Sequence, residues 1–168
     1  MLPNSFDGSA ARQRCMAYRR RILEISQQVQ ALHAAGAFSC LEMVDVIYNG
    51  LMRGVAGNSP DTFMMSKGHG CMSQYVILED LGILSRRDLD LYCKPEGRLG
   101  CHPDYGVPGI EASTGSLGHG MGLATGMAYT ERHVQKGDGM IFTVLSDGEL
   151  QEGSTWECMM MAANLEVD

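Results

Sequence analysis

The chain has 168 residues, of which 45% are hydrophobic, so it is large enough for one domain with a buried core and too apolar to be disordered. Its formal net charge of −7 argues against nucleic acid as the main partner, and its apolar runs are too short to cross a membrane. The six cysteines include no C-x-x-C pair, and the N-terminus lacks the apolar segment of a signal peptide, so we expect free thiols and a cytoplasmic location.

The first third of the chain is predicted to be mainly helical. Residues 9–35 carry apolar side chains at helical spacing, which predicts one long amphipathic helix that ends before Gly36. A second helix is expected over residues 40–51. A turn at residues 58–61 then leads into a short strand over residues 62–66.

A histidine between two glycines follows that strand, in the segment Lys67-Gly68-His69-Gly70. The glycines leave the imidazole uncrowded and allow unusual backbone angles, which suits a loop that faces a ligand. The alternative is an ordinary histidine of a surface loop. His69 is therefore a candidate site residue whose role the local pattern leaves open.

A long loop is predicted after two short helices over residues 73–81 and 85–92. Residues 94–116 lose regular periodicity and are rich in proline and glycine. A loop of this length is uncommon in a compact domain and is usually functional. It contains His102, whose alternative role is a hydrogen bond to its own backbone, and it also contains Glu111.

A glycine stripe marks the helix predicted over residues 117–135, with Gly118, Gly122 and Gly126 four residues apart. Each glycine in a helix interior costs about 1 kcal/mol relative to alanine, so we expect another backbone or a flat ligand to approach this stripe closely. Packing of the helix on a sheet is the simpler explanation for Gly122 and Gly126. Gly115, at the end of the preceding loop, is the better candidate for a ligand contact.

Residues 140–163 predict a strand, a tight turn and a helix in succession. The strand is the β-branched and aromatic run 141–145, and the helix shows apolar positions four and three residues apart. The carboxyl end of a parallel strand attracts anions, so a carboxylate there must be offset. Asp147 would coordinate a Mg2+ ion that bridges to phosphate oxygens, and Gly148 would let the backbone approach them. An ordinary Asp-Gly turn is the alternative. The fold class is α/β, with helices packed on a parallel sheet.

Four segments, in this order, resemble the N-terminal, diphosphate-binding part of transketolase. They are Ser66-Lys67-Gly68-His69, His102-Pro103-Asp104, residues 108–118 and residues 147–153. The similarity runs from about Met16 to the end of the sequence. It implies a thiamine diphosphate-binding fold and an enzyme that moves a two-carbon ketol unit between sugar phosphates. In that family the cofactor lies between two chains, with its diphosphate and Mg2+ on a domain like this one and its aminopyrimidine ring on a second domain.

The resemblance assigns cofactor-binding roles to four residues in addition to His69. Asp147 corresponds to a magnesium ligand, and Gly148 to a backbone neighbour of the diphosphate. Gly115 and Leu117 would line the cleft that holds the cofactor ring.

The resemblance also assigns catalytic roles to His69, His102 and Glu152. His69 would contact the cofactor, and both histidines would lie near the thiazolium and the substrate carbonyl. Their near-neutral pKa lets them donate to a developing alkoxide and take a proton back. Glu152 would be the interface carboxylate that meets the cofactor-activating glutamate of the partner domain, because two close carboxylates can share a proton.

The sequence departs from the family pattern at several positions. The family has a Gly-His-Pro segment after its opening helix, whereas this chain reads Gly36-Ala37-Phe38-Ser39-Cys40, and His33 is assigned to the helix rather than to the site. Ser146 stands where the family has glycine, and His119 where it has glutamine. Asn164 is too close to Asp147 to be the family's second magnesium ligand, an asparagine on the next strand.

These observations lead to a hypothesis for residues 1–168 as a single, partial N-terminal diphosphate-binding domain of transketolase. We expect a transferase component that is inactive alone and is completed by a C-terminal transketolase-like subunit or by the remainder of its own chain. A homo- or hetero-oligomer is expected, with a sugar phosphate as substrate and neither nucleic acid nor a membrane as partner. The alternative is a non-catalytic assembly or regulatory protein that retains the fold and the dimer surface.

Overall fold

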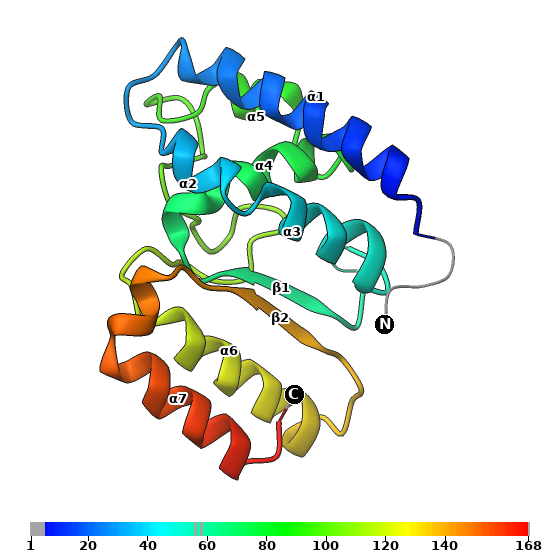
Figure 1. The fold of residues 1–168 in the computed structure, drawn as a ribbon, viewed down its shortest axis with the longest axis vertical. Coiled ribbons are helices and arrows are strands. Elements are labelled where there is room, and N and C mark those ends of the chain that lie inside the picture. Colours follow the sequence, from blue (N-terminus) through cyan, green and yellow to red (C-terminus); the bar gives the residue numbers. More distant parts are fainter. Residues whose placement is uncertain (1–5, 56, 58, 168) are drawn as a thin grey trace.

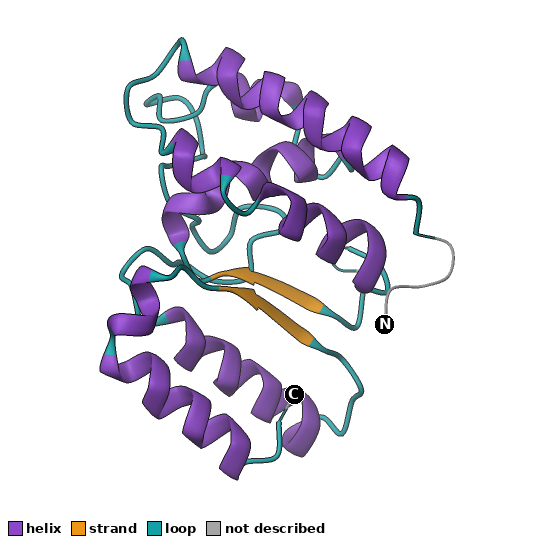
Figure 2. Ribbon diagram, viewed as in Figure 1, coloured by secondary structure: helices purple, strands orange, loops and turns teal. Residues whose placement is uncertain are grey.

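A parallel pair of strands lies between two groups of helices in the computed structural model, which describes residues 6–55, 57 and 59–167 (Figure 1). Strand β1 (Thr62–Met65) pairs with β2 (Ile141–Val144), so that Thr62 faces Ile141 and Met65 faces Val144. Helices cover both faces of this pair (Figure 2). The predicted α/β class and both predicted strands are confirmed.

The two helical groups differ in size. On one side lie α1 (Gly8–Ser26), α2 (Ala34–Phe38), α3 (Leu41–Val46), α4 (Cys71–Asp80) and α5 (Arg86–Asp90), with the π-helix η1 (Ile47–Leu51) extending α3. On the other lie α6 (Gly120–Tyr129), extended by the π-helix η3 (Thr130–Val134), and α7 (Gly153–Asn164). Short 3-10 helices, η2 (Gly68–Gly70) and η4 (Gly148–Gln151), follow the two strands. No helix of the described residues is both long enough and apolar enough to span a bilayer.

Two apolar clusters sit on opposite faces of β1. Phe63 and Met65 point into the larger cluster, which includes Ile22 and Leu41 from the helices of the first group. Met64 points the other way, into a small cluster with Ala124 of α6. This alternation is the period-2 pattern of a strand buried on both sides.

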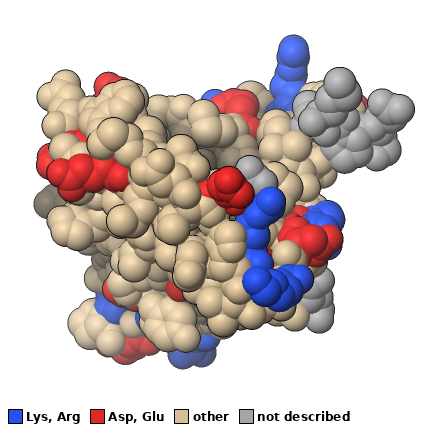
Figure 3. Space-filling model, turned by 90° about the horizontal axis from the view of Figure 1, so that it is seen from below, with Lys and Arg blue, Asp and Glu red and all other residues tan. Residues whose placement is uncertain are grey.

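The outer face of α7 is exposed. Trp156, Met160 and Met161 are 53%, 62% and 58% exposed, so two of the side chains on the predicted apolar face, Trp156 and Met160, do not reach the core of the described residues. Viewed from the side of α6 and α7, most of the surface is uncharged, and acidic and basic side chains form small separate groups (Figure 3).

The predicted helix over residues 9–35 is wrong beyond Ser26. Helix α1 begins at an Asp7 cap, whose carboxylate accepts from Ser9 N–H at 2.8 Å, and it ends where the Ser26 hydroxyl donates to the Leu23 carbonyl oxygen at 2.7 Å. The apolar side chains between α1 and α2 still pack against the main core. Helical periodicity alone cannot distinguish a bend that keeps those contacts from a continuing helix. His33 therefore lies outside α1, at the N-cap position of α2.

The glycine stripe also differs from expectation. A Cβ atom placed on Gly122 would lie 3.2 Å from Cys158 Sγ of α7, and one placed on Gly126 would have no neighbour within 4 Å. The expected packing of these two glycines on the sheet is wrong, because helix α6 turns this stripe toward α7 and toward solvent.

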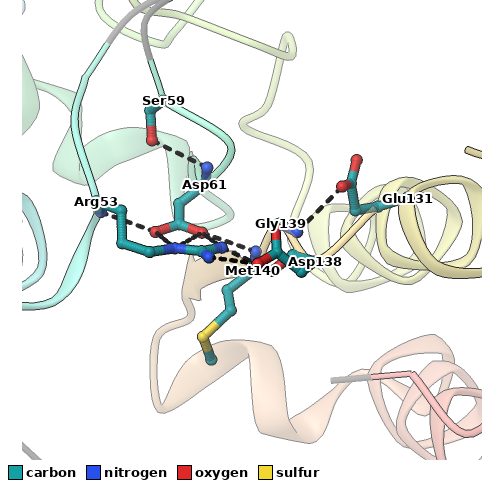
Figure 4. A network of polar contacts seen from close by, with 7 residues as sticks. All are labelled: Arg53, Ser59, Asp61, Glu131, Asp138, Gly139 and Met140. Carbon is teal, nitrogen blue, oxygen red and sulfur yellow. Dashed lines mark hydrogen bonds and ion pairs between the residues drawn. The ribbon is translucent and has the colours of Figure 1, made fainter. Parts of the chain in front are cut away.

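A polar network holds the N-terminal ends of the two strands together (Figure 4). Asp61, just before β1, has a side chain that is 1% exposed and accepts from Arg53 Nε at 3.0 Å and from Met140 N–H at 3.0 Å. Arg53 also donates from Nη1 to Asp138 at 2.8 Å. The hydrogen bonds with Arg53, followed by those from backbone N–H groups, lower the pKa of Asp61 to about 2.

Candidate functional site

The loops that follow β1 and β2 meet at the carboxyl edge of the sheet. Lys67 N–H donates to the Val144 carbonyl oxygen at 3.2 Å, which brings the two strand ends side by side. The Thr114 hydroxyl donates to the Met65 carbonyl oxygen at 2.6 Å, so the end of the long loop lies there as well. Ligands of open α/β sheets bind at this edge.

Glycines allow these segments to approach each other closely. A Cβ atom placed on Gly68 would lie 2.7 Å from Gly115 Cα, and one placed on Gly115 would lie 2.8 Å from His102 Cδ2. Gly115 also has a φ of 148°, which side chains rarely adopt. A groove of about 550 Å³ runs beside Gly115 and is lined also by His119 and Leu123. Gly115, which we predict to contact a ligand, therefore lies against His102 and beside an open groove.

Three histidines gather at this edge. The His33 ring lies 6.1 Å from the His69 ring and 5.9 Å from the His102 ring, measured between centroids. His69 and His102 are half-buried and His33 is exposed. Gly36 makes room for this arrangement, since a Cβ atom there would lie 2.7 Å from His69 Cδ2.

His33 lies at the candidate site, whereas the sequence interpretation assigned it to the first helix. Its exclusion rested on the continuous helix that the structure overturns. The useful signal was the small-residue run Ala34-Ala35-Gly36 directly after the histidine, which permits close contact with another loop. A histidine from the early part of the chain therefore lies beside His69 and His102, although the Gly-His-Pro segment of the family is absent.

The electrostatic surroundings of His69 keep its imidazole neutral. Burial lowers the pKa of His69, and electrostatic interactions with Lys67, His33 and His102 lower it further. Lys67 is itself buried, and its ammonium donates to the Ser39 hydroxyl at 2.9 Å. A neutral imidazole at this position can accept a proton or donate a hydrogen bond near pH 7.

A tyrosine of α4 holds the backbone at His102 by a hydrogen bond. The Tyr75 hydroxyl, on α4, donates to the His102 carbonyl oxygen at 3.0 Å. At the imidazole ring of His102, Cys101 Sγ lies 3.3 Å from Nδ1. The predicted alternative for His102, a hydrogen bond between its ring and its own backbone, is not seen among the contacts of the described residues.

Asp147 and Gly148 begin η4, directly after β2. Asp147 is exposed, and within residues 6–55, 57 and 59–167 its carboxylate has no hydrogen-bond or ion-pair partner. A Cβ atom on Gly148 would come no closer than 3.8 Å to Leu117 Cδ1, so the backbone there is open toward the residue predicted to line the ring cleft. The turn thus presents a free carboxylate beside accessible backbone.

This donor set fits magnesium only with a phosphate ligand. Within the described ranges, no group of three or more His, Cys, Asp or Glu side chains is placed to hold a metal ion. Mg2+ in phosphate sites is bound through one or two carboxylates, with phosphate oxygens and waters completing an octahedron. Asp147 supplies one such carboxylate, so the residues present match the protein side of a magnesium–diphosphate site.

Glu149 is a second residue for which the sequence interpretation gave no role. It is 0% exposed, and its Oε1 accepts from the Ser66 hydroxyl at 2.6 Å and from Gly118 N–H at 3.1 Å. Its Oε2 accepts from Ser146 N–H at 3.1 Å. This carboxylate joins the residue after β1, the segment that leads into α6 and the Asp147 turn. Nothing in the local pattern distinguishes it from an exposed glutamate of a turn.

The structure accommodates two residues that depart from the family pattern, Ser146 and His119. The Ser146 hydroxyl accepts from Glu149 N–H at 3.2 Å, so its side chain is turned into the loop. His119 occupies the N-cap position of α6 and lines the groove.

Glu152 is exposed and lies next to Gly118. A Cβ atom placed on Gly118 would lie 2.7 Å from the Cβ of Glu152.

Comparison with known proteins gives consistent matches. Residues 11–168 match the family described as transketolase, thiamine diphosphate binding domain. One of the subunits of the apulose-4-phosphate transketolase of Phocaeicola vulgatus is 37% identical over 155 residues, which cover 89% of this chain and 54% of that protein. Homo sapiens transketolase is 35% identical over 151 residues, which cover 83% of this chain and 24% of that protein.

A solved structure supports the same assignment. Transketolase from Leishmania mexicana matches with a TM-score of 0.80 at 28% identity, over 90% of this chain and 25% of that one. This chain spans about half (54%) of the length of the bacterial relative and a smaller part of the longer transketolases. The matched region nevertheless includes the strand ends, the three histidines and the Asp147 turn described above. The chain therefore belongs to the transketolase family and is a thiamine diphosphate binding domain of that family.

Proposed function

We propose that this domain holds the diphosphate and Mg2+ of thiamine diphosphate and, together with a partner polypeptide, transfers a two-carbon ketol unit between sugar phosphates. The observation that carries the proposal is the meeting of His33, His69 and His102 at the sheet edge that also presents Asp147. A relative of similar sequence is named as one subunit of a transketolase, which supports a separate partner chain.

The binding roles follow from the free groups of the site. Asp147 would supply the protein carboxylate of the magnesium ion, and Gly148 would leave room for the diphosphate. Gly115 and Leu117 would line the cleft for the ring. When bound, the cofactor supplies the electron sink that two-carbon transfer needs.

The histidines are the groups that would handle protons of the substrate. A neutral His69 can donate a hydrogen bond to the alkoxide that develops at the substrate carbonyl and take a proton back. His102 and His33 lie close enough to share this task on one sugar. Glu152, which is exposed, would meet a carboxylate of the partner domain and share a proton with it.

Isothermal titration with thiamine diphosphate and Mg2+ tests this proposal. We expect binding by the chain together with a C-terminal transketolase partner, and at least a tenfold loss of affinity in Asp147→Ala. The matched control is Asp138→Ala, which removes another exposed aspartate, 84% exposed, far along the sheet from the histidines. No binding by the chain, alone or with the partner, would refute the cofactor role.

A partner chain is further supported by the exposed outer face of α7. Trp156, Met160 and Met161 would be covered in an oligomer, which is the usual fate of such apolar patches. Sedimentation at micromolar concentration tests this expectation. A chain that stays monomeric, also in the presence of the partner chain, would contradict it. The non-catalytic alternative predicts an assembled complex that turns over no ketose donor, whereas turnover that Asp147→Ala abolishes would exclude it.

A further inference from the structure

The thiol of Cys101 has no role in the proposed function, although it contacts an imidazole of the candidate site. Its Sγ lies 3.3 Å from Nδ1 of His102, which is hydrogen-bond distance for sulfur. Cys101 is half-buried and is not part of a disulfide. Because an imidazole has only two nitrogens, this contact decides which of them is left for a ligand.

The chemistry of the two groups gives this hydrogen bond a direction. An unprotonated imidazole nitrogen is an acceptor, whereas a thiol sulfur accepts only weakly. Free thiols are mostly protonated at neutral pH, so the S–H group is available as the donor. The thiol therefore donates to Nδ1, and the single proton of the neutral ring of His102 lies on Nε2.

The rest of the ring is packed so that the Nε2 corner stays free. A Cβ atom placed on Gly115 would lie 2.8 Å from Cδ2 and 3.0 Å from Cγ of His102, so this edge of the ring rests against the loop backbone. Among the described residues, the ring of His102 makes its hydrogen bond at Nδ1 and none at Nε2. The protonated nitrogen is thus the one left for a ligand.

Other groups hold the backbone at this position. The Tyr75 hydroxyl donates to the His102 carbonyl oxygen at 3.0 Å, and Cys71 Sγ donates to the Cys101 carbonyl oxygen at 3.3 Å. Neither bond uses the Cys101 thiol. Removing that thiol should therefore leave the loop in place and change the imidazole ring alone.

We propose that Cys101 is a positioning residue that holds His102 in its Nε2–H tautomer, ready to donate a hydrogen bond to the substrate. In the ketol transfer this N–H group would stabilise the alkoxide that develops at the substrate carbonyl. A partner that orients a histidine through its other nitrogen is a recurrent part of catalytic sites. The catalytic half of this inference rests on the proposed function of His102, whereas the tautomer does not.

Nitrogen NMR of the full chain, labelled with 15N-histidine, tests the tautomer at pH 7.5. The spectrum of His102→Gln identifies the signals of His102 among those of the five histidines. We expect an unprotonated Nδ1 and a protonated Nε2 in the wild-type chain. In Cys101→Ala the two 15N shifts should move toward each other, because both tautomers become populated. Cys101→Ser should restore the wild-type pattern, since a hydroxyl group also donates.

Cys158→Ala is the matched control, because Cys158 is another half-buried free cysteine and lies on α7. It should leave the shifts of His102 unchanged. A protonated Nδ1 in the wild-type chain would overturn the proposal, and this result does not depend on the folding of any variant. Unchanged His102 shifts in a Cys101→Ala chain with the wild-type unfolding midpoint would overturn it as well.

Ketose turnover with the partner chain present separates this inference from the proposed function. Cys101→Ala should lower kcat about three- to tenfold, the effect of one ordinary hydrogen bond, with KM nearly unchanged and with recovery in Cys101→Ser. The expected tautomer in a chain that neither binds thiamine diphosphate nor supports turnover would refute the proposed function alone. Equal kcat values for the wild-type chain and Cys101→Ala would refute the positioning role alone.

Discussion

Replacing Glu149 by glutamine should destabilise the domain strongly although the two side chains have the same shape. The carboxylate accepts three hydrogen bonds, two on Oε1 and one on Oε2, at a position that is 0% exposed. An amide has a single acceptor oxygen, so in either orientation Gly118 N–H or Ser146 N–H faces an NH2 group. A buried donor without an acceptor costs about 1–3 kcal/mol, and the remaining bonds lose their charge assistance. We therefore expect the free energy of unfolding to fall by roughly 2–4 kcal/mol.

Equilibrium urea unfolding at pH 7, followed by circular dichroism, measures this loss. Glu152→Gln is the matched control, because it makes the same chemical change three residues away on an exposed side chain. The control should stay within about 0.5 kcal/mol of the wild-type value. A Glu149→Gln chain as stable as this control would refute the role given to the buried carboxylate. Because Glu149 also positions the Asp147 turn, the same substitution should weaken cofactor binding.

Four further substitutions test other parts of the structure. Asp61→Asn should lower stability by roughly 1–2 kcal/mol at pH 7, since one pKa unit is worth about 1.4 kcal/mol and its guanidinium partner is partly screened by solvent. The pKa of Asp61 falls from 3.8 to about 2 on folding, so this stabilisation is present above pH 3.8, and the difference between variant and wild-type unfolding curves should shrink as the pH drops toward 2. Gly68→Ala should destabilise the chain and weaken cofactor binding, because the new methyl group would meet the backbone of Thr114 and Gly115. Gly126→Ala, whose methyl group meets no atom within 4 Å, should raise the melting temperature. His33→Gln should leave the unfolding midpoint unchanged and should lower ketose turnover, measured with the partner chain present, at least tenfold; full activity would remove His33 from the site.

Much of the fold and of the site could be predicted because the signals are local. The two strand runs depend on neighbouring residues, and each forms a strand where expected. The structure also shows a capping box at the start of α5, which needs only Ser85 and Asp88, three residues apart. The wrong end of the first helix shows the limit of this reasoning. The same apolar spacing is satisfied by a helix or by a bent segment that packs on the same core.

The missed residues depend on contacts between distant parts of the chain. Glu149 receives its donors from Ser66, 83 residues away, and from Gly118, 31 residues away. His33 becomes a site residue only because the loops that carry His69 and His102 fold against it. No periodicity or turn pattern records such a meeting.

The parallel α/β class and the Asp147 turn could be predicted from the sequence, and so could the glycines that let loops approach one another. Residue spacing and backbone preference suffice for these, since they act over a few residues. The side chains that share the candidate site, and the carboxylate that is buried beneath it, could be identified from the three-dimensional contacts alone. Burial and hydrogen bonding depend on which strands and loops become neighbours, and parallel pairing of β1 with β2 brings together segments that are far apart along the chain.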